Sequence, residues 1–303
     1  VNQLGGAIYN DNASLIIGGE ANDNTTFSAN MSPDKGGAIY TAGDKEVYIN
    51  ATFRGNAAVQ GGAIYITGGN NVTVAGTFDS NTSSDNGGAI YSDSSFKVAA
   101  NGMNTLFTNN KNSADDTSSA IYMNSSNFPI ITMEATNRGR ITFRDAINGS
   151  AKYKIAIIGD DTDSHVEFYN NILNADITID NVSTDINFES LFAGATEITN
   201  EPFLNSTITL NSGTLNANTM ILEHYTITDA DDSINFNVTV PDEGGSIPVL
   251  NLRKSFVNLS KVAENPEDMV GNHADDVYMG KLISDAGNNY AIDVLFSTDY
   301  DIN

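Results

Sequence analysis

The chain has 303 residues, with 38 acidic and 14 basic side chains that give a formal net charge of −24 at pH 7. Nucleic acid and other polyanions are disfavoured as partners, because phosphate binding needs clustered Lys and Arg. The sequence contains no cysteine, which excludes disulfides and thiolate metal sites. No apolar run reaches the roughly 18 residues of a membrane-spanning helix.

The pentapeptide Gly-Gly-Ala-Ile-Tyr occurs four times, beginning at Gly5, Gly36, Gly61 and Gly87, and a fifth copy at Ser118 has serine in place of both glycines. A repeat of this length that carries strand residues and turn glycines is typical of a stack of similar coils. We therefore expect one continuous solenoid. Its function would lie along an extended surface rather than in a single pocket.

Each pentapeptide belongs to a larger unit, in which a second strand of alternating apolar residues ends at Phe and is followed three residues later by Asn. Alternation buries one face of a strand. In a parallel β-helix, equivalent residues on successive coils lie roughly 4.8 Å apart, so like side chains stack. The predicted structural stack comprises Phe27, Phe53, Phe78 and Phe107 with Asn30, Asn56, Asn81 and Asn110.

The turn residues are interpreted as architectural. The paired glycines allow positive φ and a close approach of two backbones. The Asn after each Phe is expected to adopt the left-handed conformation at the corner and to bond through its amide to the coils above and below.

The tyrosine of each pentapeptide has the opposite parity to the adjacent isoleucine, so an inward isoleucine places the tyrosine on the outer face. The sequence thus predicts a candidate binding strip of Tyr9, Tyr40, Tyr65, Tyr91 and Tyr122. The alternative, in which a neighbouring loop covers these tyrosines, stays open.

After about Asn124 the pentapeptide disappears, but short strands spaced by Asn, Asp and Gly continue. We interpret residues 1–303 as one continuous β-helix, with the repeats in 1–125 and degenerate coils in 126–250. Residues 251–303 are expected to form an insertion or a C-terminal cap, with a possible short helix over 252–263.

Two motifs carry a family resemblance. Phe53-Arg54-Gly55-Asn56 ahead of Gly61-Gly62-Ala63-Ile64 resembles the paired motifs of chlamydial polymorphic membrane proteins. The segment 139–147 is similar to the Gly-x-Ile-x-Phe-x-Asp-Pro-Ile element of that family, with Ala146 where proline is usual. The motif resemblance covers about residues 5 to 147.

The resemblance implies an all-β, right-handed, single-stranded parallel β-helix, pectate-lyase-like in architecture, and a passenger domain of an autotransporter related to AIDA-like adhesins. Such a passenger is secreted and displayed on the bacterial cell surface, outside the outer membrane, as a virulence-associated repeat protein. Cell adhesion to a host cell receptor or glycan, or self-association, would be its role.

The chain is expected to be the passenger only. It opens with Val1 and no signal peptide, as expected of a mature or excised portion of a longer protein. The C-terminal stretch has neither enough alternating segments nor a terminal aromatic residue for a translocator barrel. Membrane contact is therefore expected only through a barrel absent from this sequence.

A polysaccharide-degrading or polysaccharide-binding β-helix is the main alternative. Glycosidase chemistry requires two carboxylates on adjacent coils, and Asp176 and Asp180 share strand parity, with Asp185 close behind. Among 38 acidic residues such coincidences are expected, so no catalytic residue is assigned and the chain is predicted not to be an enzyme. The arginine-rich segment 138–144 is given a structural role by the resemblance. A passive surface stalk is the second alternative.

No metal site and no cofactor are predicted. His165, His224 and His273 lie in unrelated contexts without zinc spacing. The acidic turns at 160–163 and 229–232 offer oxygen ligands, but neither matches an EF-hand loop, and they are interpreted as solvated turns.

Overall fold

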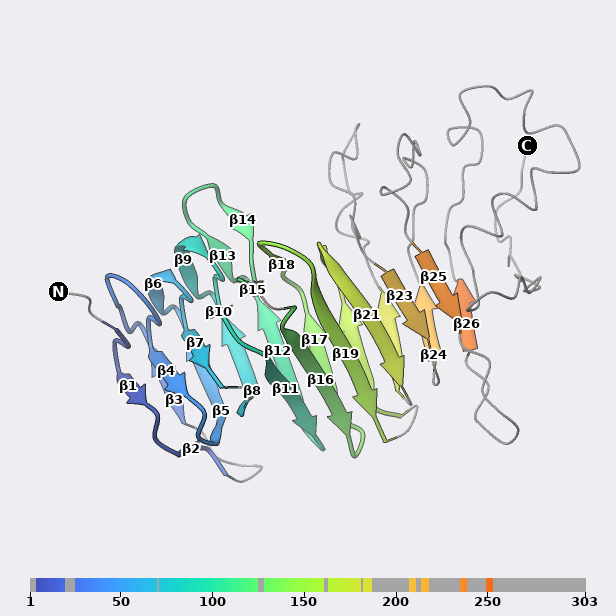
Figure 1. Ribbon diagram of the computed structural model, residues 1–303, viewed down its shortest axis with the longest axis horizontal. Helices are drawn as coiled ribbons and strands as arrows, with labels where there is room; N and C mark the ends of the chain where they lie inside the picture. Colours follow the sequence, from blue (N-terminus) through green and yellow to red (C-terminus); the bar gives the residue numbers. More distant parts are fainter. Residues whose placement is uncertain are drawn as a thin grey trace, which may run out of the picture.

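The computed structural model describes residues 4–19, 25–69, 71–124, 128–160, 163–180 and 182–186, and the strands at 207–210, 214–217, 235–238 and 249–252. Within these residues there is no helix, and none therefore that could span a membrane. The strands wind into successive coils that follow one another along the long axis of the molecule (Figure 1). The chain is an all-β parallel β-helix, as predicted.

One sheet contains the pentapeptide strands. Its six strands are parallel and follow chain order: β1 (Ile8–Asp11), β4 (Ile39–Gly43), β7 (Ile64–Gly68), β10 (Ile90–Ser92), β15 (Ile121–Met123) and β18 (Ile147–Gly149). The register pairs isoleucine with isoleucine and tyrosine with tyrosine from each pentapeptide to the next. The predicted stacking of equivalent residues is confirmed at this sheet.

A second, sixteen-stranded sheet forms two sides of the helix. Its two runs join at the long strands β5 (Val47–Arg54) and β8 (Val72–Asp79), each of which pairs with strands of both runs. One run contains β2 (Leu15–Ile17), β11 (Phe96–Asn101), β16 (Ile130–Thr136), β19 (Tyr153–Gly159), β21 (Ala175–Asp180), β23 (Thr207–Leu210) and β25 (Asn235–Val238). The other contains β3 (Thr26–Ser28), β12 (Asn104–Thr108), β17 (Arg140–Phe143), β20 (His165–Phe168), β22 (Ser183–Ile186), β24 (Thr214–Ala217) and β26 (Val249–Leu252).

A small third sheet lies between the Phe-x-x-Asn corners and the glycine pairs. It consists of β6 (Ala57–Gln60), β9 (Thr82–Asn86), β13 (Lys111–Asn112) and β14 (Thr117–Ser118). The β13 and β14 strands pair antiparallel, as a hairpin inserted into an otherwise parallel coil. This hairpin leads into the fifth pentapeptide, in which serines replace both glycines.

Inward side chains fill the interior in columns. The predicted phenylalanines stack with ring centroids 4.5 to 5.0 Å apart, and Phe143 and Phe168 extend the column by two coils beyond the prediction. Phe53 and the later rings are fully buried, whereas Phe27 at the first coil is only partly covered. Each buried ring contributes roughly 1.5 to 3 kcal/mol before entropy is counted.

The asparagines form a hydrogen-bonded ladder beside this column. At Asn81, the backbone N–H and Nδ2 both donate to Oδ1 of Asn110, at 3.0 and 2.9 Å, and Nδ2 also donates to the carbonyl of Phe53 at 3.0 Å. The same pattern links Asn30 to Asn56 and Asn56 to Asn81. The predicted inter-coil role of these amides is confirmed.

The ladder ends on a carboxylate. Oδ2 of Asp145 accepts hydrogen bonds from the backbone N–H of Asn110 at 2.9 Å and from its Nδ2 at 2.7 Å. Asp145 is buried, and desolvation raises the pKa of its carboxyl, although the bonds from Asn110 act in the opposite direction.

The predicted left-handed conformation of the ladder asparagines is wrong. The residue just before each of them has positive φ instead: Ala29, Gly55, Ser80 and Asn109, with φ between 54° and 61°. The amide must point into the corner to meet the next coil, so the preceding residue makes the turn.

The two glycines of each pair differ in backbone conformation. Gly36 has φ of +64°, a conformation that costs glycine little. A Cβ at the following Gly37 would lie only 2.0 Å from the carbonyl oxygen of Gly62 on the next coil. A Cβ at Gly36 would itself lie 2.1 Å from the carbonyl oxygen of Ile39, so both glycines allow a close approach and the first also has positive φ.

Several predictions fall outside the described residues: the insertion or cap, apart from Asn251 and Leu252 in β26, the short helix, His224, His273 and the turn at 229–232.

Candidate functional site

The five pentapeptide tyrosines form an outer column, here called the tyrosine ladder: Tyr9, Tyr40, Tyr65, Tyr91 and Tyr122. The strands place one tyrosine per coil opposite the buried isoleucine. Adjacent rings stack with centroids 5.0 to 5.5 Å apart and planes 8° to 24° from parallel. Because the ring faces cover one another, ring edges and hydroxyl groups form the outer side of the ladder.

Exposure along the ladder is uneven. Tyr9 is 54% exposed, whereas Tyr65 is 2% and Tyr91 5% exposed, and Tyr40 and Tyr122 are intermediate. The ladder therefore has covered tyrosines in the middle and a freely exposed one at the N-terminal end.

Tyr65 is held between a cation and a carboxylate. Nζ of Lys35 donates to the Tyr65 hydroxyl oxygen at 2.9 Å and lies 4.3 Å from the ring centroid. The Tyr65 hydroxyl donates to Oδ2 of Asp93, and Oδ1 of Asp93 accepts from Nδ2 of Asn124 at 2.6 Å. Lys35, Tyr65 and Asp93 come from three different coils, so only the assembled helix forms this relay.

Four of the ladder hydroxyls, those of Tyr40, Tyr65, Tyr91 and Tyr122, are protonated at physiological pH. Burial raises the pKa of Tyr40, Tyr65, Tyr91 and Tyr122, and nearby carboxylates raise it further. These hydroxyl groups are therefore neutral, and each can donate one hydrogen bond and accept others.

Four carboxylates act electrostatically on the ladder tyrosines: Asp11, Asp34, Asp85 and Asp93, of which Asp93 also bonds to Tyr65. Within the described residues none of the four forms an ion pair. The Asp85 carboxylate accepts only from neutral amides there, Nε2 of Gln60 at 2.8 Å and Nδ2 of Asn86 at 2.7 Å. Lys35 is the only cation in contact with the ladder in this part of the chain, so the strip is negative overall.

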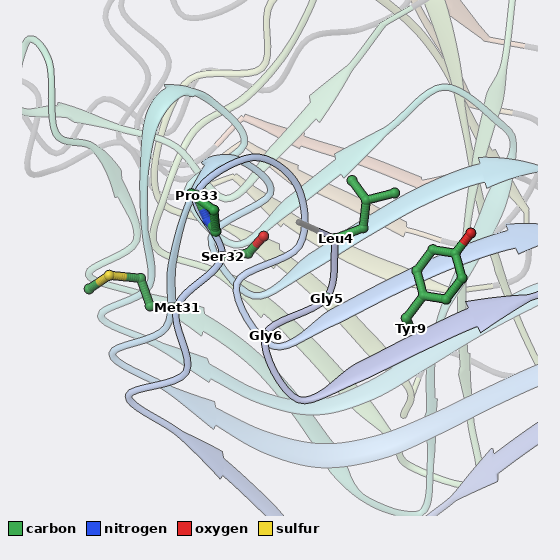
Figure 2. A pocket seen from close by; sticks show the side chains of 7 residues that line it. All are labelled: Leu4, Gly5, Gly6, Tyr9, Met31, Ser32 and Pro33. Atoms are coloured by element: carbon green, nitrogen blue, oxygen red, sulfur yellow. The ribbon is translucent and has the colours of Figure 1, made fainter. Parts of the chain in front are cut away.

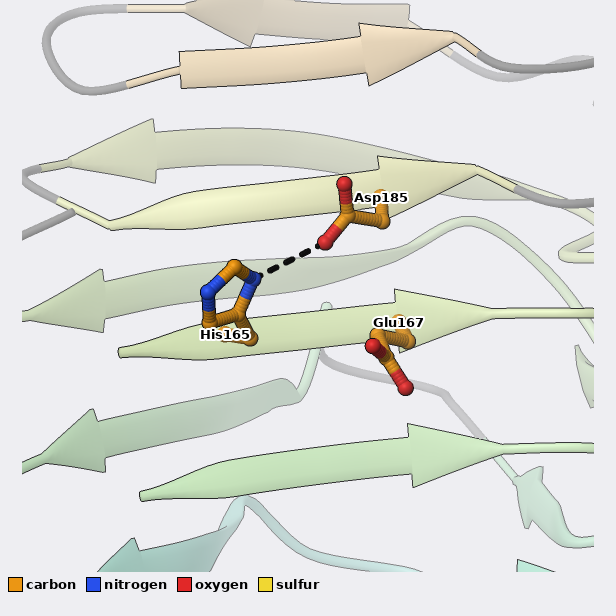
Figure 3. A group of neighbouring side chains, drawn as sticks. All are labelled: His165, Glu167 and Asp185. Carbon is orange, nitrogen blue, oxygen red and sulfur yellow. Dashed lines mark hydrogen bonds and ion pairs between the residues drawn. The ribbon is translucent and has the colours of Figure 1, made fainter. Parts of the chain in front are cut away.

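A second group of polar side chains lies on the outer side of β20 and β22 (Figure 3). Nδ1 of His165 is 3.0 Å from Oδ2 of Asp185, and Glu167 accepts from Thr142 Oγ1 at 3.0 Å and from Arg140 Nη1. One potential ligand atom from each of His165, Glu167 and Asp185 lies within 4.8 Å of the others. His165 lies on a strand, and the sequence did not predict its proximity to Glu167 and Asp185.

This group is better described as an ion-pair network than as a metal centre. Both oxygens of Glu167 already accept hydrogen bonds, and the guanidinium of Arg140 supplies the positive charge that a metal ion would bring. His165 and Asp185 are 20 residues apart, and only the pairing of β20 with β22 brings them together. Glu167 lies opposite Asp185 in this pairing, and the sequence alone does not show that the two strands pair in this register.

The carboxylates considered for glycosidase chemistry are divided between two runs of strands. Asp176 lies on β21, 3.6 Å from Nζ of Lys152, and Asp180 ends the same strand. Asp185 lies on β22 and faces His165. At the acidic turn, Asp160 accepts from the backbone N–H of Asn137 at 2.7 Å.

A hollow of about 540 Å³ opens at the N-terminal end of the helix. Figure 2 shows the residues that line it: Leu4, Gly5, Gly6, Tyr9, Met31, Ser32 and Pro33. Met31 is 75% exposed. The lining contains no acid–base pair, and its main feature is the exposed first ring of the tyrosine ladder.

Three stretches of the chain, residues 24–42, 50–67 and 75–93, match the Chlamydia polymorphic membrane protein repeat. Each stretch contains one Phe-x-x-Asn corner and the Gly-Gly-Ala-Ile-Tyr that follows it. The resemblance predicted from these motifs is confirmed. No curated protein and no solved structure matches the chain significantly.

Proposed function

We propose that the chain is a surface-displayed adhesin passenger that binds its partner through the side of the β-helix bearing the tyrosine ladder. The repeats suggest a surface autotransporter passenger associated with the outer membrane. Adhesion itself, to a host receptor or glycan or to a second copy of the chain, is supported by the tyrosine ladder on the outer surface of the coils.

The observation that carries this proposal is the ladder itself. Isoleucine and phenylalanine columns already fill the interior, and the tyrosines lie outside the core cluster. Tyrosine is enriched at protein interfaces because one side chain offers a large rigid ring and a polar tip. An outer column of tyrosines in register, in which Tyr9, Tyr40 and Tyr122 are accessible, is a surface suited to recognition.

The experiment is adhesion of beads coated with the purified chain, measured both on cultured host cells and as bead aggregation. The ladder variant is Tyr40→Ser with Tyr122→Ser. The matched control is Tyr48→Ser with Tyr169→Ser, which removes two partly buried tyrosines from elsewhere on the helix. We expect at least about a tenfold loss of adhesion for the ladder variant, the scale of interface hot spots, and little change for the control.

Two outcomes would contradict the proposal. A wild-type chain that neither binds cells nor aggregates beads would favour a passive stalk. Release of reducing sugar or unsaturated product from a polysaccharide panel, abolished by Asp176→Asn or Asp180→Asn, would favour the enzyme alternative.

A further inference from the structure

Lys35 shows how the tyrosine ladder accommodates an ammonium group. Its Nζ donates to the Tyr65 hydroxyl oxygen, and that hydroxyl in turn donates to Asp93. The positive charge is thus joined to a carboxylate through a neutral phenol. Charge-assisted hydrogen bonds of this kind are stronger than neutral ones.

The phenols recur along the ladder without a cation, although the Asp93 carboxylate that bonds to Tyr65 does not recur in register. The hydroxyls of Tyr40, Tyr91 and Tyr122 make no hydrogen bond to any residue that the structure describes. Asp85 lies close enough to Tyr91 and Tyr122 to raise the pKa of both. Because the coils repeat, these phenols occupy positions equivalent to Tyr65.

The stacking geometry disfavours a sugar as the principal ligand of the ladder. A sugar packs against the face of an aromatic ring, but the faces of the inner rings are occupied by the neighbouring tyrosines. Hydroxyl edges and carboxylates remain available, and these groups accept hydrogen bonds from cations.

Resting on the proposed adhesive function, we propose that the tyrosine ladder and its flanking carboxylates bind a lysine-rich segment of a partner protein. Lysine ammonium groups of the partner bond to the hydroxyl edges of the half-buried Tyr40 and Tyr122, and to the carboxylates Asp34 and Asp85. A second copy of this chain is a poor source of such a segment, because it has only 14 basic residues against 38 acidic ones.

The first test is calorimetric binding of a short lysine peptide at about 0.15 M salt, where diffuse attraction is screened. The ladder variant is Asp85→Asn with Asp93→Asn. Its control, Asp163→Asn with Asp176→Asn, removes the same charge from residues that pair with Arg138 and Lys152. We expect the ladder variant to bind about tenfold more weakly, with the control within about twofold.

An equal loss in both variants would overturn the proposal, because attraction would then be diffuse. No binding of the peptide by the wild-type chain would overturn it as well. The peptide with acetylated lysines is expected not to bind, and binding equal to that of the charged form would contradict a role for the ammonium groups.

The second test seeks a gain of affinity. Lys35→Gln vacates the ammonium position on the Tyr65 hydroxyl, so the lysine peptide is expected to bind about threefold more tightly. Lys154→Gln removes the same charge from exposed Lys154 on β19 and is the control. Identical gains in the two variants would place the peptide away from the ladder.

The two proposals can fail separately. Cell adhesion that depends on Tyr40 and Tyr122, without binding of the lysine peptide, would leave the adhesive function standing and reject the basic partner. Ladder-dependent peptide binding without adhesion to cells or beads would support the lysine-binding site and reject the adhesive function.

Discussion

The inner phenylalanine stack and the outer tyrosine ladder are built by the same repeat and have nearly the same spacing. Ring centroids are 4.5 to 5.6 Å apart inside and 5.0 to 5.5 Å apart outside. Inside, the rings are sealed by apolar neighbours and the asparagine ladder. Outside, they are flanked by carboxylates and one lysine. Stacking is thus a consequence of the coil, and the surroundings decide whether a column is scaffold or binding surface.

The largest effect is expected inside. Phe78→Ala would leave a cavity between Phe53 and Phe107, and we expect it to lower the free energy of unfolding by about 3 to 5 kcal/mol. Urea unfolding of the purified chain measures this. A loss below about 1 kcal/mol would mean that the stack contributes far less than burial of this kind predicts.

The asparagine ladder should come next. Asn81→Ala removes the acceptor of Asn56 and a donor to the Phe53 carbonyl, and leaves buried polar groups unpaired. We expect a loss of about 2 to 4 kcal/mol in unfolding free energy. The exposed Asn101 offers a control, and Asn101→Ala should cost about 0.5 kcal/mol or less. Equal losses would show that the inter-coil bonds do not matter.

A smaller effect is expected at the tyrosine ladder. Tyr65→Phe breaks the bonds to Lys35 and Asp93 while keeping the ring, and should cost about 1 kcal/mol. Tyr91→Phe removes a hydroxyl that bonds to no described residue, so thermal unfolding should be unchanged. If Tyr91→Phe destabilises the chain as much as Tyr65→Phe, the hydrogen bonds of the Tyr65 hydroxyl are not what stabilises the fold there.

The smallest effect is a pH dependence at the end of the asparagine ladder. Burial raises the pKa of Asp145 in the folded chain, so folding favours the protonated carboxyl. The stability gained from this protonation is fully present below the unfolded pKa of about 3.9 and is lost as the pH rises through the folded pKa. Asp145→Asn should therefore unfold at higher urea concentration than wild type at pH 7, with the difference shrinking toward pH 4. A variant that is less stable at pH 7 would contradict this assignment.

Parity and repetition made the columns predictable. Ile39 and Phe53 recur at fixed places in each unit, so their register and burial follow from the strand period. The corner geometry did not follow, because the sequence does not reveal that Asn56 points inward while Gly55 makes the turn.

The chemistry between coils was less accessible to sequence reasoning. Lys35 and Asp93 occupy different places in their units, so no periodicity relates them to Tyr65. His165 and Asp185 likewise meet only through the pairing of two strands. Contacts between equivalent positions can be predicted from a repeat, whereas contacts between non-equivalent positions require the structure.

The central claim is that the ladder serves recognition rather than stability, and one triple variant tests it most directly. Tyr40→Phe, Tyr91→Phe and Tyr122→Phe together retain the stacked rings and remove only hydroxyls that bond to no described residue. Adhesion and thermal unfolding should be measured on the same preparation. We predict an unchanged unfolding temperature with an adhesion loss of about tenfold; full adhesion by a stably folded variant would contradict the claim.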